Sequence, residues 1–139
     1  MAYTVTIHIA PRGTLRRLED NQPSNSGHMF YTLHDGSSST LSSHGFAPKG
    51  HKDASDGWTA PGEASSKDYH NYDRSSTKSY TLEITKEQYD IMKDFGEHPE
   101  KYGFDTEYNG LKNSCVDYSY FAFNLAGLKF RDGRFYPQN

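Results

Sequence analysis

The chain has 139 residues, which is enough for one domain with a hydrophobic core and too few for two. Only 33% of the residues are hydrophobic, but these include 11 Tyr and 8 Phe, whose side chains bury a large area each. The net charge is −3 and the charges are interspersed, so we expect no nucleic-acid partner. The group that comes closest to a basic patch is Arg12, Arg16 and Arg17, and such a group is typical of a solvated turn.

Cys115 is the only cysteine, which excludes a disulfide within the chain and a zinc site of four cysteines. The sequence contains no apolar run as long as a transmembrane helix. Residues 1–4 lead straight into a strand pattern and do not resemble a signal peptide. We therefore expect synthesis in the cytoplasm, with any export carried out by other machinery.

The first element expected is a strand over residues 3–9, where apolar and polar residues alternate. Four side chains would face the core: Tyr3, Val5, Ile7 and Ile9. His8 would face outward. The composition of residues 21–27 predicts a loop.

A β-hairpin is predicted next, with strands over 28–34 and 40–46. A three-residue turn centred on Gly36 would place His28 directly opposite His44. The polar segment 48–78 follows, with Trp58 as its one large apolar residue. It is interpreted as an insertion or flap over the site, and its composition fits a disordered surface loop equally well.

Two helices are expected in the second half of the chain. A strand over 79–84 leads to Thr85 and Gln88, which have the spacing of a capping box for a helix ending at Gly96. Asn113 or Ser114 would cap a second helix that begins at Cys115 and stops at Gly127. Its apolar face would comprise Val116, Tyr120 and Phe123, widened by Phe121 and Leu125. A short strand is predicted over residues 128–136.

Cys115 is the strongest candidate for chemistry. At the first turn of a helix, unpaired N–H groups and the helix dipole favour a thiolate. A free cysteine is also among the most commonly buried residues, so packing alone would explain it as well. A thiolate needs a base and a group that orients the base, and the hairpin would supply His28 and His44 for these roles. The remaining histidines are interpreted as surface residues: His34, His51, His70 and His98.

Three segments carry a resemblance to a known family. These are Gly27-His28-Met-Phe-Tyr-Thr-Leu-His-Asp-Gly, then His44-Gly-Phe-Ala-Pro48, then Tyr108-Asn-Gly-Leu-Lys-Asn-Ser-Cys115-Val-Asp-Tyr. Together with Ala126-Gly127-Leu128 they resemble the circularly permuted branch of the NlpC/P60 (papain-like) cysteine hydrolases, in which the histidine strand precedes the cysteine helix. The resemblance spans residues 3–128 apart from 48–78. It implies a single α+β domain over 1–139, in which a small antiparallel sheet packs on the helix that carries the cysteine.

The resemblance also implies roles for individual residues. Cys115 would be the nucleophile, His28 the base and His44 the third polar residue. Asn113 and Ser114 would support the oxyanion. The family pattern is Asn-Cys or Asn-x-Cys, and in this chain Ser114 lies between Asn113 and the cysteine. Asn113 or Asp53 are alternatives for the third residue.

No cofactor or metal is expected. A zinc site made of His28, His44 and Cys115 would lack a short-spaced ligand pair. The spacing from Asp53 to Gly57 is too sparse for a calcium loop.

The activity implied is acyl transfer, and two substrates fit it. One is a peptide amide of peptidoglycan, cleaved by an amidase or endopeptidase. The other is a lipid acyl ester, handled by a phospholipase or acyltransferase. A non-catalytic cell-wall binding module is a third possibility. By analogy with antibacterial effectors of type VI-like secretion systems, we expect a secretion-system carrier, delivery to the periplasm of a target cell and a cognate immunity protein.

Overall fold

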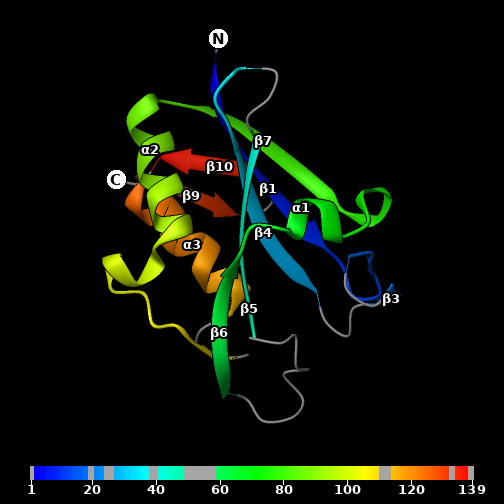
Figure 1. Cartoon of the computed structure of the whole chain (residues 1–139). Coiled ribbons are helices and arrows are strands. Elements are labelled where there is room, and N and C mark those ends of the chain that lie inside the picture. Colours follow the sequence, from blue (N-terminus) through cyan, green and yellow to red (C-terminus); the bar gives the residue numbers. More distant parts are fainter. Residues whose placement is uncertain are drawn as a thin grey trace.

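The structure is a computed structural model that describes residues 2–18, 21–23, 27–37, 41–48, 59–109, 114–131 and 134–137. Its fold is α+β, built on a six-stranded antiparallel sheet with the strand order β7-β1-β4-β5-β6-β8 (Figure 1). These strands are β1 (Tyr3–Ala10), β4 (His28–His34), β5 (Leu41–Pro48), β6 (Thr59–Ser65), β7 (Lys78–Ile84) and β8 (Glu107–Asn109). The helices are α1 (Asp68–Asn71), α2 (Lys86–Glu97) and α3 (Cys115–Leu125), with short 3₁₀ helices η3 (Arg74–Ser76) and η4 (Pro99–Tyr102).

The alternating pattern of β1 is confirmed. Val5 and Ile7 are fully buried on the face that meets α2 and α3, and Tyr3 and Ile9 are partly buried. His8, expected to face outward, is buried on the other face. Alternation shows which residues point away from the first core but cannot show that a second layer covers them.

The predicted register of the hairpin is wrong. Tyr31 pairs with His44 and His34 pairs with Leu41, so six residues separate the paired ends where three were expected. The change is by an odd number of residues, and such a change exchanges the two faces of one strand relative to the other. His28 therefore lies on the face of the sheet opposite to His44.

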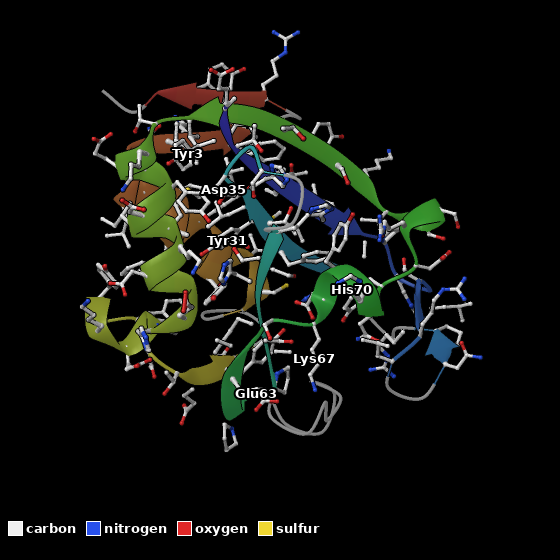
Figure 2. The ribbon with its side chains drawn as sticks, turned by 45° about the horizontal axis from the view of Figure 1, so that its top comes forward. Tyr3, Tyr31, Asp35, Glu63, Lys67 and His70 are labelled. Atoms are coloured by element: carbon white, nitrogen blue, oxygen red, sulfur yellow. The ribbon has the colours of Figure 1, made fainter. Side chains whose placement is uncertain are left out.

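Helices α2 and α3 cover the first face, where Tyr31 points from the sheet toward them (Figures 1 and 2). The capping box of Thr85 and Gln88 is confirmed at the start of α2. Gly96, expected to end α2, lies inside the helix and packs against His44.

The expected apolar face of α3 is confirmed only in part: Phe123 is buried, and Phe121 and Leu125 are partly buried against the core. The end of the helix before Gly127, which has a φ of 71°, is confirmed. Val116 is 36% exposed and Tyr120 is 38% exposed. The buried side chains are Cys115, Tyr118, Ser119, Ala122 and Phe123. These residues have the spacing of one helix face, counted from Cys115. A search for large hydrophobic residues alone misses this face, because it contains Ser119 and Ala122.

The short helix α1 packs on the other face of the sheet, against β4 and β5 (Figure 1). Within the polar segment 48–78, residues 59–65 form β6 and residues 68–71 form α1, whereas 49–58 lie outside the described residues. Asn71 joins α1 to an earlier part of the chain through two hydrogen bonds. Its backbone oxygen accepts one from Arg17 N, and its side-chain oxygen accepts the other from Leu18 N. Tertiary contacts, which the local composition does not reveal, therefore order this segment.

Two further strand pairs complete the fold. β2 (Leu15–Arg16) pairs with β3 (Gln22–Pro23), and β9 (Leu128–Arg131) pairs with β10 (Arg134–Pro137). The C-terminal stretch thus forms a hairpin where one strand was expected. Among the described residues, no helix has the length and hydropathy needed to cross a bilayer.

Candidate active site

Cys115 is the first residue of α3 and lies beside the beginning of β4. Ser114 is the N-cap and forms a capping box with Asp117, whose carboxylate accepts from Ser114 N at 2.8 Å. The backbone N–H of Met29 donates to Cys115 Sγ at 3.4 Å. The thiol is buried and lies where both a helix N-terminus and an N–H donor favour the thiolate.

His28 is the first residue of β4, and its ring meets a carboxylate. His28 Nε2 lies 2.7 Å from Asp68 Oδ2, and both side chains are buried. Since Nε2 is engaged by Asp68, the other ring nitrogen remains for the thiol. A carboxylate in this position fixes both the tautomer and the direction of the ring.

The charges of Cys115 and His28 favour one another. Burial alone would lower the pKa of His28, but the neighbouring charges of Asp68 and Cys115 raise it to about 10. Burial would likewise raise the pKa of Cys115, yet the charge of His28 and its hydrogen bond, followed by the Met29 N–H, lower it below the usual thiol value. The site therefore favours a thiolate beside an imidazolium.

Aromatic rings hold the plane of the His28 ring. The ring of Tyr72 stacks on His28 with a centroid distance of 4.6 Å and an interplanar angle of 17°. Phe30 stacks on His28 at 5.8 Å and also on His8 at 4.7 Å. His8 is fixed in turn through Thr32, whose hydroxyl lies 2.8 Å from His8 Nε2. The orientation of His28 is thus set by a carboxylate and by ring contacts from two layers.

Gly45 makes room for the carboxylate of Asp68. A Cβ atom at Gly45 would collide with Asp68 Oδ2, the oxygen that meets His28. The nearby Ser43 Oγ accepts from Tyr69 N at 3.2 Å and so helps to seat α1 on β5. The absence of a side chain at residue 45 is therefore required for the contact between α1 and His28.

The structure brings together Cys115, His28 and the N-cap Ser114, but it does not bring His44 to them. His44 lies on the α2 face, with its ring 5.2 Å from that of Tyr31 and its Nε2 2.9 Å from Ser42 Oγ. Burial lowers the pKa of His44 to about 4. The expectation that His44 orients the base rested on the predicted hairpin register and on the family resemblance. The observed register places Asp68, and not His44, beside His28. Asn113 and Asp53 lie outside the described residues.

Sequence reasoning missed Asp68 and Tyr72. Asp68 lies 40 residues after His28, in the polar segment that was interpreted as a flap or a disordered loop. The available signal was Asp68-Tyr69-His70-Asn71-Tyr72, a group of aromatic and polar residues inside a stretch dominated by small residues. Nothing in that group shows which distant strand it contacts.

Because His28 and His44 occupy opposite faces, the zinc ligand set considered from the sequence is not assembled. In the part of the chain that the structure describes, no three His, Cys, Asp or Glu side chains are placed to share a metal ion.

Comparison with known proteins gives no match to a family model, to a curated protein or to a solved structure. The function must therefore be argued from the site itself. A thiol, an imidazole and a carboxylate in series form an arrangement that activates a nucleophile.

Proposed function

We propose that the protein is a cysteine hydrolase that works by acyl transfer. Cys115 is the nucleophile, His28 the general base and acid, and Asp68 the residue that orients His28. The observation that carries this proposal is the buried series of thiol, imidazole and carboxylate, with Nε2 of His28 2.7 Å from Asp68. A cysteine that only packs in the core would need neither a lowered thiol pKa nor a partner with its own carboxylate.

The chemistry follows from the charges. His28 holds the proton of Cys115, and the thiolate bonds to the acyl carbon of the substrate. The bond to the leaving group breaks, and that group departs with the proton from His28. Water then gives a proton to His28 as its oxygen bonds to the acyl carbon, and the carbon–sulfur bond breaks.

The start of α3 is suited to stabilise the oxyanion. The capping box occupies the N–H groups of Ser114 and Val116, so we assign the oxyanion to the N–H of Cys115. The dipole of α3 adds to this stabilisation. Any contribution from Asn113 would add to it.

We propose a peptide amide of peptidoglycan as the substrate. The support is the resemblance to the permuted NlpC/P60 branch, together with an antiparallel sheet whose histidine strand precedes the cysteine helix in the chain. By the same resemblance, we propose that the protein acts as an antibacterial effector. Secretion machinery would carry it to the periplasm of a target cell, and an immunity protein would neutralise it.

One observation favours a lipid acyl ester as a second candidate substrate. Val116 and Tyr120, which are 36% and 38% exposed, lie one turn apart on the outer face of the helix that begins at Cys115. Exposed apolar side chains beside a site suit a lipid chain. This pair is small, so the peptide remains the first proposal.

The test is a paired digest by wild type and Cys115→Ala. Purified peptidoglycan is analysed for new muropeptides, and mixed phospholipid vesicles for released fatty acid. We expect new muropeptides from wild type and a rate at least roughly 10³-fold lower from the variant. Fatty acid released only by wild type would reassign the substrate to lipid. If wild type changes neither substrate, or the variant is as active as wild type, the proposal fails and a non-catalytic binding module becomes the better interpretation.

A further inference from the structure

A hollow of about 600 Å³ lies beside α1, between the end of β6 and residue 18. Its wall includes Ala64 of β6, Lys67 and Asn71 at the two ends of α1, and Leu18, which is 58% exposed. This volume is within the range of ligand sites. Figure 2 shows Lys67 between α1 and the β6 residue Glu63.

The outer edge of β6 is open at Ala64. β8 pairs with β6 only from Thr59 to Pro61, and Gly62 N donates to Thr106 O on the same side. Alternate residues of a strand direct their N–H and C=O to the same side, so Ala64 directs both groups to this outer side. Among the described residues none pairs with Ala64 there, and the residue is exposed.

An open strand edge has a specific chemical complement. The N–H and C=O of one strand residue bind the C=O and N–H of one residue of an extended peptide, which is recognition by strand addition. The hollow beside Ala64 adds an apolar contact at Leu18 and charges of both signs, at Lys67 and Glu63. A lipid chain would leave the backbone groups of Ala64 without partners, so the edge favours a peptide.

The hollow also borders the segment that carries Asp68. Ser65, next to Ala64, pairs with Gly45, and the space left by Gly45 holds the carboxylate of Asp68. Lys67 and Asn71, which line the hollow, flank Asp68 in the chain. An occupant of the hollow would therefore contact the segment that orients His28.

We propose that this hollow is a substrate subsite in which an extended segment of the peptide pairs with Ala64. The inference rests on the proposed function for the identity of that peptide, a stem peptide of peptidoglycan. A pairing of one residue needs only one amide N–H and one C=O in the ligand. It is therefore compatible with a peptide that contains D-residues.

Direct binding tests the subsite without relying on turnover. The probe is the peptidoglycan stem tetrapeptide, titrated by calorimetry or NMR into Cys115→Ala. Adding Ala64→Pro removes the outward N–H, and a proline is tolerated at an open strand edge. We expect Kd to rise about fivefold, the usual effect of one hydrogen bond. The matched variant Ala64→Ser keeps the N–H and should retain the tighter Kd.

The outcomes separate this inference from the proposed function. An equal Kd for Ala64→Pro and Ala64→Ser would overturn the subsite, as would a failure of Cys115→Ala to bind the tetrapeptide. Loss of affinity in the proline variant alone would support it, and circular dichroism would show that this variant is folded. If the peptide binds through Ala64 but wild type does not hydrolyse it, the subsite stands and the proposed hydrolase activity fails.

Discussion

His28 and His44 come from neighbouring strands of one sheet, and both side chains are buried. They lie on opposite faces of the sheet, however, and their surroundings differ. On the α1 face, His28 meets the carboxylate of Asp68, and its pKa rises to about 10. On the α2 face, His44 meets a serine hydroxyl and the ring of Tyr31, and burial lowers its pKa to about 4. One histidine is thus kept charged and available for chemistry, and the other is kept neutral as part of the core.

The comparison teaches that the layer above a strand decides what a buried histidine can do. Both rings are also made possible by a glycine. Gly45 leaves room for the partner of His28, and Gly96 leaves room for the ring of His44 itself. If the two faces differ in function as proposed, matched changes on each face should have separable effects.

The largest expected effect comes from removing the partner of each histidine. Asp68→Asn keeps the shape of the side chain but removes the charge that orients His28 and stabilises its cation. We expect kcat for the peptidoglycan substrate to fall by roughly 10²–10⁴-fold. Ser42→Ala removes the hydroxyl that meets His44 and should leave kcat within about twofold of wild type.

The measurement is steady-state hydrolysis by both variants, with folding checked by thermal denaturation. Equal loss of activity in both variants would mean that the two faces do not differ as proposed. Unchanged activity in Asp68→Asn would remove Asp68 from the mechanism.

A smaller and more diagnostic effect is expected from the two glycines. Gly45→Ala forces the Asp68 carboxylate away from His28, because the new Cβ would occupy the position of Oδ2. A misplacement of this kind should lower kcat roughly 10- to 100-fold. Gly96→Ala instead forces the buried ring of His44 to move, which should cost about 1–3 kcal/mol of stability, reduced by the better helix propensity of alanine.

Urea denaturation and hydrolysis rates, measured on both proteins, separate the two results. We expect Gly96→Ala to keep the kcat of its folded fraction. A loss of kcat in Gly96→Ala with none in Gly45→Ala would reverse the assignment of the two faces.

The features predicted from sequence are those that short segments determine. The alternation of β1 and the capping box at Thr85 depend on residues within one element, and both are confirmed. The register of the β4–β5 hairpin depends on how many residues remain unpaired between the strands, and neither Gly36 nor its neighbours reveal that number. The wrong register placed His44 opposite His28 and so supported its assignment to the site.

The partner of His28 could not be predicted for a different reason. Asp68 reaches His28 only because Asn71 fastens α1 to residues 17 and 18 and because Gly45 leaves space for the carboxylate. These contacts join segments that are far apart in the chain. In contrast, the position of Cys115, the proposed nucleophile, at the start of a helix could be predicted, because a helix N-terminus has a local sequence signature.

The last and smallest effect concerns how stability depends on pH. In wild type, at any pH above the lowered pKa of Cys115 and below the raised pKa of His28, the pair holds one proton, on the imidazole. Between the ordinary values of 6.5 for histidine and 9.0 for the thiol, the unfolded chain also holds one proton on these groups, on the sulfur. The numbers of bound protons are equal, so the pair should add no pH dependence to stability in this window.

Cys115→Ala should expose the contribution of His28 alone. The native variant still holds a proton on His28 because of Asp68, whereas the unfolded chain loses it above about pH 6.5. The contribution is therefore fully present below that pH and is lost as pH rises toward the native pKa of His28, by up to about 1.4 kcal/mol per pH unit.

Urea denaturation of wild type, Cys115→Ala and Cys115→Ala/Asp68→Asn from about pH 6 to pH 9 measures this slope. We expect it to be steepest in the single variant and nearly absent in the double variant, since His28 then has neither the carboxylate nor the thiolate to oppose the effect of burial. Equal slopes in all three proteins would show that Asp68 does not keep His28 protonated.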